Sequence, residues 1–300
     1  MITKVGTTTI LDSGAGDSYL VAAGITTLET TTAASGESFT GGASLTSVTN
    51  YGKGESFNFT QGNIKFVDDG TGTSFVAGNG NANISTTNGG ARIVLGNGTQ
   101  TVSLRGNGNA FSMGNTTTGT STITTYGGAN QVIAGNGTIV YNEDGAGDQV
   151  ILGSGSDTVY IGRAATAPTS DVLQLGNGTT NTIWTYASGN TINGGTGMTF
   201  LDEESTGNTV VANAAGGSIT FGGAFKLSGG DHLDLTQLLA GEGGVNAGNV
   251  ASFITESMNG STLMLAVKGL NGTENVTMTA AGSQTLSTLI SDHFLVLPTS

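Results

Sequence analysis

The 300-residue chain contains no cysteine, two prolines, two histidines and one tryptophan. Without cysteine, the chain has no disulfide bond, zinc–thiolate site or thiol nucleophile, so its fold must hold without covalent cross-links. The two histidines, His232 and His293, do not form an H-x-x-x-H metal motif, and the many serines and threonines lack a partnering base. We therefore do not expect the protein to be an enzyme.

Positive charge is also scarce. Eight lysines and arginines stand against 21 aspartates and glutamates, which gives a formal net charge of −13, and the basic residues are scattered singly. Binding to a phosphate backbone requires a cluster of basic side chains, and an anionic membrane surface selects for the same feature. Nucleic acid and anionic membranes are therefore not expected as partners.

Long apolar runs are missing as well. No segment approaches the roughly 18 apolar residues of a membrane-spanning helix. The N-terminal segment lacks the basic start, apolar run and cleavage site of a secretory signal peptide. The sequence thus predicts no transmembrane segment, and any export would use another route.

Glycine, in contrast, is abundant, with 52 residues, and apolar side chains recur at every ninth position. After a slip of three positions the same frame resumes, and it resumes again after an irregular insertion. The first run is Phe39, Val48, Phe57, Phe66, Phe75, Ile84, Ile93, Val102 and Phe111; the second is Ile123, Val132, Tyr141, Val150 and Val159; the third is Ile183, Ile192, Leu201, Val210 and Ile219. A strict period of this kind is typical of a repeat architecture.

Two glycine columns repeat at twice that distance: Gly36, Gly54, Gly72, Gly90 and Gly108, and Gly78, Gly96 and Gly114. One repeat unit accommodates one short strand and a tight turn, in which glycine and asparagine supply positive φ. Leu95, Leu104, Met113, Leu152 and Ile161 lie two positions after framed residues and should face the same interior.

The pattern predicts an all-β fold, a right-handed parallel β-roll or β-solenoid with about 18 residues per coil and a small β-rich C-terminal cap. We assign residues 1–35 to an N-terminal strand region that caps or joins the solenoid, 36–225 to the β-roll, and 226–300 to a C-terminal domain for capping or secretion. Asn79, Asn97 and Asn115 share the doubled spacing of the glycine columns, which predicts an amide column with side-chain hydrogen bonds between coils.

The segment "LGSGSDTVY", residues 152–160, resembles the RTX repeat G-G-x-G-x-D-x-U-x, in which calcium occupies the turns. This resemblance implies calcium candidates at Asp148 and Asp157, with Asp144, Asp12 and Asp17 as weaker ones. Most other aspartate positions of the repeat hold uncharged residues, so a ladder of occupied sites is not expected. The alternative is that these carboxylates are solvated turn residues, which is also our interpretation of the acidic turn at 202–204.

Residues 229–300, with "GDHLDLTQLL" and the apolar end "HFLVLP", resemble the C-terminal targeting region of bacterial type I secretion substrates. The resemblance implies export from a Gram-negative cell to the cell surface or beyond, with the signal retained, and makes His232 an exposed turn residue of that element. The alternative is a domain that caps the open end of the solenoid.

We expect a secreted structural protein that binds copies of itself and forms an extracellular fibre or surface layer. The alternatives are a calcium-dependent adhesin and a module that binds ice or a cell-surface polysaccharide. Trp184 and Tyr186 would form a sugar-stacking patch or simply pack. Ice binding requires one repeated outward residue, but the positions before the framed residues are irregular: Ser74, Asn83, Arg92, Thr101 and Ala110.

Overall fold

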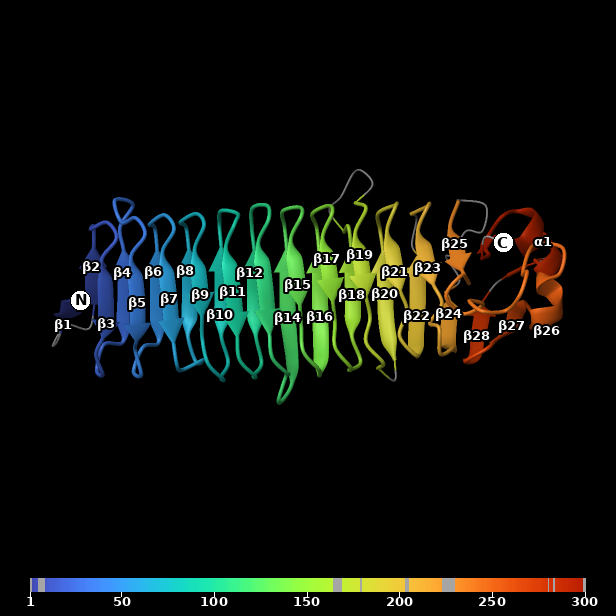
Figure 1. The fold of residues 1–300 in the computed structure, drawn as a ribbon, viewed down its shortest axis with the longest axis horizontal. Coiled ribbons are helices and arrows are strands. Elements are labelled where there is room, and N and C mark those ends of the chain that lie inside the picture. The colour runs from blue at the N-terminus through green and yellow to red at the C-terminus, as the bar shows by residue number, and fades with distance from the viewer. Residues whose placement is uncertain are drawn as a thin grey trace. The chain divides into compact units, whose positions relative to one another are not determined.

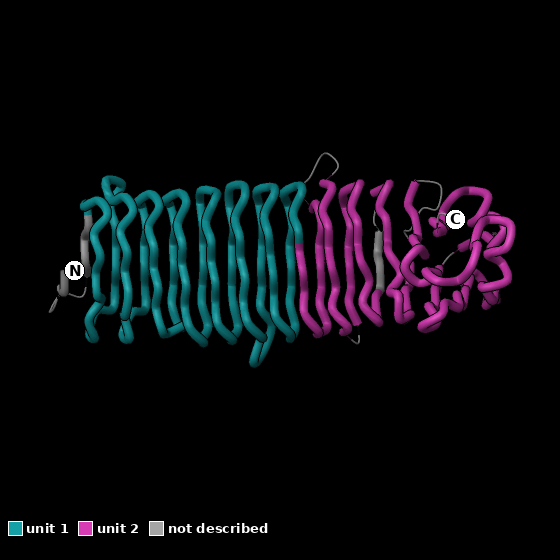
Figure 2. The backbone as a smooth tube through the Cα atoms, in the orientation of Figure 1, with its two compact units in different colours: residues 1–149 teal, residues 150–300 magenta. Residues whose placement is uncertain are grey.

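The computed structural model describes residues 2–4, 9–163, 169–178, 180–202, 205–222, 230–279, 281–282 and 284–298. Side chains are described from residue 13 onward, except those of residues 199–202. The chain divides into two compact units, residues 1–149 and residues 150–300 (Figure 2).

Unit 1 consists of short parallel strands that alternate along the chain between two sheets (Figure 1). Sheet A contains, in spatial order, β1 (Ile2–Lys4), β3 (Ser18–Val21), β5 (Ser38–Gly41), β7 (Ser56–Phe59), β9 (Ser74–Val76), β11 (Arg92–Leu95), β13 (Ala110–Met113) and β15 (Gln131–Ile133). Sheet B contains β2 (Thr9–Asp12), β4 (Thr27–Thr30), β6 (Ser47–Asn50), β8 (Lys65–Asp68), β10 (Asn83–Thr86), β12 (Thr101–Leu104), β14 (Thr120–Thr125) and β16 (Thr138–Glu143).

The nine-residue frame corresponds to the register of these strands, because framed residues two steps apart are paired in the same sheet. Phe39 pairs with Phe57, Phe57 with Phe75, Phe75 with Ile93 and Ile93 with Phe111, each one coil further along sheet A. Every one of these side chains is buried, because alternate residues of a strand point to opposite faces and the framed residue always points inward. Phe111 then pairs with Val132, the next framed residue of sheet A, so the slip in the frame is one longer turn that leaves the register intact.

Aromatic rings fill the interior of the first coils. The Phe57 ring stacks on that of Phe39, with centroids 5.1 Å apart and planes 9° apart, and Phe39 stacks in turn on Tyr19. Phe66 of sheet B stacks on Phe75 of sheet A at 4.1 Å, so the two sheets share one core. The parallel ladder already includes β1 to β4, upstream of residue 36.

Unit 2 continues the same construction with longer insertions. Its strands in sheet A are β17 (Gln149–Ile151), which begins at the last residue of unit 1, and then β19 (Val172–Gln174), β21 (Thr191–Asn193), β23 (Thr209–Val211), β25 (His232–Asp234) and β29 (Leu295–Val296). Those in sheet B are β18 (Thr158–Ile161), β20 (Asn181–Thr185), β22 (Gly197–Asp202), β24 (Gly217–Phe221), β28 (Gly272–Met278), β27 (Thr262–Gly269) and β26 (Ile254–Asn259).

The C-terminal residues are built onto the solenoid by strand pairing. β28 pairs in parallel with β24, while β27 and β26 follow as antiparallel hairpin strands. β29 pairs in parallel with β25. A short 3₁₀ helix (Val250–Phe253) and helix α1 (Leu286–Ser291) complete this region. The prediction of a parallel β-solenoid with about 18 residues per coil and a small β-rich C-terminal region is confirmed.

One detail of the predicted frame is wrong. Phe200, rather than Leu201, pairs with Ile183, because the coil that leads into β22 is one position shorter than the frame requires. The nine-residue spacing does not continue past residue 225, but the parallel ladder does: Leu233 pairs with Val210, 23 rather than 18 positions earlier, and is completely buried. The segment "GDHLDL" therefore contributes one more strand, β25, to sheet A.

Candidate functional site

A column of buried side-chain oxygens runs along the turns that precede the strands of sheet A. Each oxygen accepts a hydrogen bond from a backbone N–H of the preceding coil, and the donor and acceptor residues occupy the same place in their coils. Four such bonds are Glu37 N–H to Glu55 Oε2 at 2.8 Å, Ala91 N–H to Asn109 Oδ1 at 3.1 Å, Asn109 N–H to Asn130 Oδ1 at 3.0 Å and Asn190 N–H to Asn208 Oδ1 at 3.0 Å. A buried N–H requires a partner, and this column provides one where no ladder bond is available.

Asp148 belongs to this column. Its side chain is completely buried, and its Oδ1 accepts the backbone N–H of Asn130 at 2.8 Å. The Asn130 amide approaches the same carboxylate at 3.2 Å, and the Tyr141 hydroxyl donates to Oδ2 at 3.2 Å. The donors that surround Asp148 thus compensate in part for its removal from water. The interpretation of Asp148 as a solvated turn carboxylate is wrong, while its role as a calcium ligand stays a prediction.

The other calcium candidates lie in different surroundings. Asp157 is buried and precedes β18 of sheet B, whereas Asp148 precedes β17 of sheet A. Asp144 is half-buried after β16, and Asp17 is exposed with its Oδ2 3.4 Å from the Tyr19 hydroxyl. Asp12 ends β2, but its side chain is outside the described ones, as are those of residues 202–204. Across the described residues, no three side chains of His, Cys, Asp or Glu gather in a way that could hold a metal ion.

The asparagine column is present, but its predicted bonding is wrong. Asn79 Oδ1 accepts the backbone N–H of Asn97 at 2.8 Å, and Asn97 Oδ1 accepts that of Asn115 at 2.8 Å. The bonds therefore join a side chain to the backbone, whereas the prediction was of bonds between side chains. The reason is that a turn N–H needs an acceptor, and the amide oxygen one coil away provides it.

An aromatic cluster lies on the outer surface of unit 2. Tyr160 and Trp184 are register partners on the neighbouring strands β18 and β20, and both are half-buried. The guanidinium carbon of Arg163 is 3.9 Å from the centroid of the Tyr160 ring and 5.9 Å from that of Tyr186. The sequence drew attention to Trp184 and Tyr186 but missed Tyr160 and Arg163. The frame itself could have found Tyr160, which follows the framed Val159 and must point outward.

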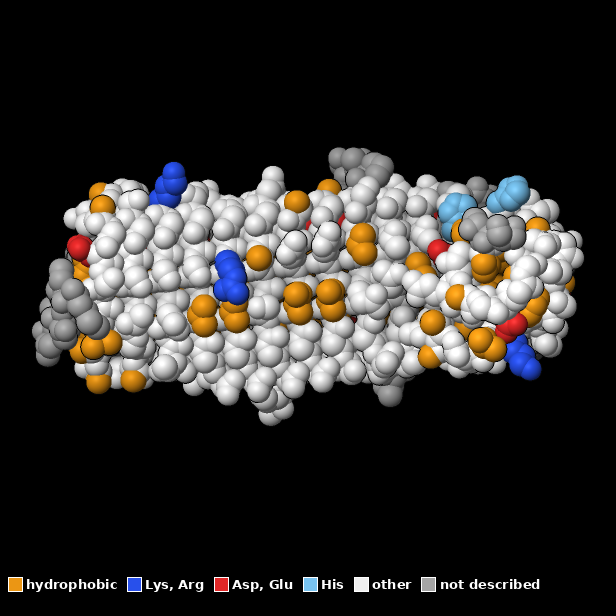
Figure 3. Space-filling model, in the orientation of Figure 1, with side chains coloured by type: hydrophobic (Ala, Val, Ile, Leu, Met, Phe, Trp, Pro, Cys, Tyr) orange, Lys and Arg blue, Asp and Glu red, His pale blue; other side chains and the backbone are white. Residues whose placement is uncertain are grey.

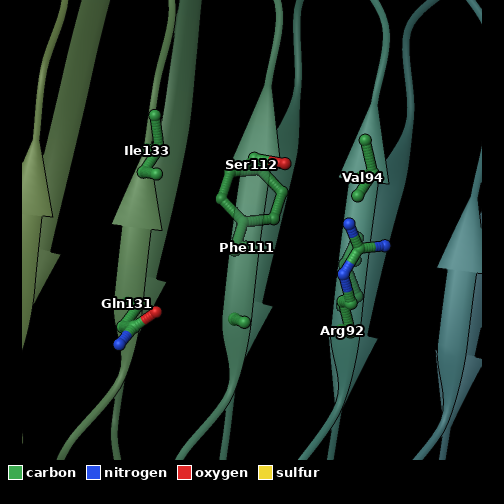
Figure 4. A pocket seen from close by; sticks show the side chains of 8 residues that line it. Arg92, Val94, Phe111, Ser112, Gln131 and Ile133 are labelled. Carbon is green, nitrogen blue, oxygen red and sulfur yellow. The ribbon is translucent and has the colours of Figure 1, made fainter.

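A shallow groove lies on the outer face of sheet A in unit 1, with a volume of about 170 Å³ (Figure 4). Ala110 and Ser112 on β13 are small, while their register partners on β11 and β15 are larger, so the central strand forms the floor. Arg92 and Val94 form one wall, and Gln131 and Ile133 form the other. One face of the molecule, seen in Figure 3, carries few charged side chains between scattered apolar ones.

The structure also corrects the argument about ice binding. Successive nine-residue steps alternate between sheets, so Ser74, Arg92 and Ala110 lie on sheet A, whereas Asn83 and Thr101 lie on sheet B. These residues do not form one row. On sheet B of unit 1 the row consists mainly of hydroxyl and amide side chains but is interrupted by Lys65 and Val140: Thr27, Ser47, Lys65, Asn83, Thr101, Thr122 and Val140.

The two histidines come close together at the start of β25. His232 begins β25 and is half-buried, and its Nδ1 is 3.0 Å from the backbone carbonyl oxygen of His293. The preceding residue, Asp231, is buried and accepts the N–H of Asn208 at 2.8 Å, as a member of the turn column.

The helices in the described part of the chain are all too short or too polar to cross a membrane.

Glu274 is a buried carboxyl group where β28 joins the solenoid. Its register partners are Gly217 on β24 and Val267 on β27, and its side chain points inward together with Val276 and Met278. Burial raises the pKa of Glu274 from 4.5 to about 7, and the backbone N–H of Asn213 opposes this shift in part.

This pKa predicts a pH-dependent stability. The folded state holds its proton on Glu274 up to about pH 7, whereas the unfolded chain releases it near 4.5, so stability falls as the pH rises through this window. The Glu274→Gln variant should lose this slope, which is at most about 1.4 kcal/mol per pH unit. Urea unfolding of both proteins between pH 4.5 and 8 measures it. Burial also raises the pKa of Asp68, which is present in both proteins. Subtracting the variant's curve of unfolding free energy against pH from that of the parent protein cancels the contribution of Asp68. A difference that does not change with pH contradicts the prediction.

Strand β26 is an unprotected edge. It pairs with β27 on one side, and in the described structure it is the outermost strand of its sheet. Five consecutive residues, Thr255 to Asn259, are exposed. Natural edge strands are commonly protected by lysine, proline or a bulge. The single charged residue of β26, Glu256, instead turns to helix α1 and accepts the N–H of Leu286 at 3.1 Å.

Comparisons with protein-family models, with curated proteins and with solved structures find no match to this chain. The chain is thus assigned a fold, the parallel β-solenoid, and no family.

Proposed function

We propose that the protein is a secreted structural protein whose copies join into an extracellular fibre or surface layer by strand addition at β26. The observation that carries this proposal is the exposed edge of β26. Its outward backbone N–H and C=O groups form a template on which another strand can pair.

The partner strand we propose is β2 of a second copy. Both strands are outermost members of sheet B in the described structure, so their pairing would continue that sheet from one copy into the next. A contact between two different surfaces repeats indefinitely unless its rotation closes a ring, and it therefore produces a filament. Pairing of β26 with another β26 would instead produce a closed dimer.

The test is a proline at position 258. Asn259 and Thr262 flank the tight turn of the β26–β27 hairpin and form a hydrogen-bonded pair, so the N–H of Met258 points away from β27. Met258→Pro removes this outward donor and leaves the hairpin bonds intact. We expect the concentration needed for assembly to rise on the order of tenfold or more, which corresponds to about 1.4 kcal/mol. Sedimentation velocity and negative-stain microscopy measure it.

Met258→Ala is the matched control, because it removes the same side chain but keeps the N–H, and it should assemble like the parent protein. Circular dichroism of both variants checks that the fold is retained. A parent protein that stays monomeric at high concentration contradicts the proposal, as does a proline variant that assembles normally. A closed dimer would show that β26 pairs with itself.

Location outside the cell is part of the proposal, and it rests on the resemblance of residues 229–300 to type I secretion signals. A calcium-dependent adhesin is the alternative, and it depends on ligands such as Asp148 and Asp157. Repeating the sedimentation experiment with calcium and with a chelator distinguishes assembly that requires the ion from assembly that does not.

A further inference from the structure

We propose that Tyr160, Trp184, Tyr186 and Arg163 form a binding platform for a neutral polysaccharide on the outer face of sheet B. We call these four residues the aromatic platform. It shares no residue with β26, so this inference stands independently of the assembly proposed above.

The strand register fixes the platform. Tyr160 and Trp184 lie directly opposite each other on β18 and β20, which are neighbouring rungs in Figure 1. Their sequence neighbours Val159 and Ile183 are completely buried, so alternation along the strand directs both aromatic side chains outward. Neighbouring strands are about 4.8 Å apart, and two aromatic side chains at this spacing make a continuous apolar strip.

Arg163 holds the strip in place and supplies hydrogen-bond donors. Its guanidinium lies over the Tyr160 ring at 3.9 Å and near Tyr186 at 5.9 Å. The backbone N–H of Tyr186 donates to the carbonyl of Ile161 at 2.9 Å, which ties this tyrosine to the coil of Tyr160. Arg163 is exposed, and it forms no ion pair with the carboxylates of the described residues, so its N–H groups are accessible.

A sugar ring matches this chemistry. The C–H groups on one face of a pyranose are apolar and carry partial positive charge, which suits the negative face of an aromatic ring. Its hydroxyl groups lie around the rim, where they meet the guanidinium fork and the polar ends of the tyrosines. Thr158 and Thr182, each two positions before an aromatic residue of the platform, lie on the same outward face and extend the polar rim.

Charge favours a neutral glycan. The chain has a formal net charge of −13, so it repels polyanions such as nucleic acids and polyuronates over the range of the Debye length. Arg163 alone provides one positive charge, far fewer than a phosphate or carboxylate polymer requires. A polymer of uncharged sugars meets no such repulsion, and its repeating rings can follow neighbouring rungs.

The single tryptophan makes the test specific, because the tryptophan fluorescence of the whole chain comes from Trp184 in the platform. Titration of the intact protein with dextran, galactomannan and soluble β-glucan should produce a saturable change in emission with at least one of them. Tyr160→Ala should weaken that binding on the order of tenfold, and Tyr160→Phe should restore it.

Tyr126→Ala is the matched control, because Tyr126 carries a similar stacked guanidinium, that of Arg105 at 4.4 Å, but belongs to unit 1. This variant should bind like the parent protein. Four results would overturn the proposal. The first three are no saturable change with any neutral polysaccharide, binding of polygalacturonate alone, and equal losses in Tyr160→Ala and Tyr126→Ala. The fourth is loss of self-association in Tyr160→Ala with unchanged glycan binding, which would assign the platform to a second copy.

Discussion

Phe57→Ala is expected to lower the free energy of unfolding by about 3–5 kcal/mol, the range for removal of a buried aromatic ring. Phe57 is completely buried and contacts rings on both sides along its column: Phe39 at 5.1 Å and Phe75 at 6.4 Å between centroids. It also meets Phe66 of the opposite sheet at 5.6 Å. The substitution therefore leaves a cavity that borders three coils.

Urea unfolding followed by circular dichroism measures the loss. Tyr51→Ala is the control, since Tyr51 lies in the same region of unit 1 but is 39% exposed, and it should change stability by less than about 1 kcal/mol. Because each coil of a solenoid contacts only its neighbours, we also expect the Phe57→Ala transition to broaden. A Phe57→Ala protein as stable as the control would show that the aromatic column does not hold these coils together.

Gly78→Ala is expected to destabilise unit 1 by about 3 kcal/mol, the upper end of the range for overpacking. A Cβ atom at Gly78 would lie 1.9 Å from the carbonyl oxygen of Thr60 in the preceding coil, and the obstructing atom is backbone, which has little room to move. Gly96 and Gly114, one and two coils further on, face similar obstructions. The methyl group therefore forces two coils apart at the turn that follows β9.

Gly243→Ala is the control, because nothing lies within 4 Å of a Cβ at that position and its φ is not positive. Thermal unfolding of the two variants compares the same chemical change with and without the obstruction. Equal midpoint temperatures of unfolding for the two variants would mean that the turn at Gly78 can open to admit a side chain.

The two glycine columns show how far the sequence alone reaches. Their regular spacing predicted the coil, and the coil is confirmed. Their shared explanation, positive φ, was incomplete. Gly54 and Gly72 have φ near +70° and open space around them, whereas Gly78 and Gly96 lack positive φ and lie against the backbone of the neighbouring coil. The spacing shows where a glycine is needed. It does not distinguish a glycine required for positive φ from one required because the neighbouring backbone is too close for a Cβ atom.

Candidate sites were harder to predict because they depend on which residues become neighbours across coils. A calcium repeat needs carboxylates at its aspartate position, so the resemblance assigns no role to the uncharged residues there. In the structure, asparagine at Asn109 and Asn130 and glutamate at Glu55 serve the same purpose, which is to accept a turn N–H. These side chains share a carbonyl or carboxylate oxygen that can extend to the backbone of the preceding coil. The calcium pattern, which requires carboxylates, does not include the asparagines.

Arg163 illustrates the second difficulty. It follows β18 in sequence, but its two ring contacts come from different coils, and Tyr186 lies beyond β20. An irregular insertion separates Arg163 from Tyr186, so the nine-residue period does not relate the two positions. Only the observed register of β18 with β20 brings these side chains together.

The turn column has a direction. Asn130 receives the N–H of Asn109, and Asp148 receives that of Asn130, so at these turns a coil obtains its acceptor from the one that follows it in sequence. In the asparagine column the direction is reversed, since Asn79 and Asn97 accept the N–H groups of the coils that follow them. A coil added on the C-terminal side thus supplies an acceptor to the coil before it at one turn and meets an existing acceptor at the other. Removal of one full coil keeps each kind of turn beside its own kind, whereas removal of half a coil would place the turns that precede sheet A against those that precede sheet B.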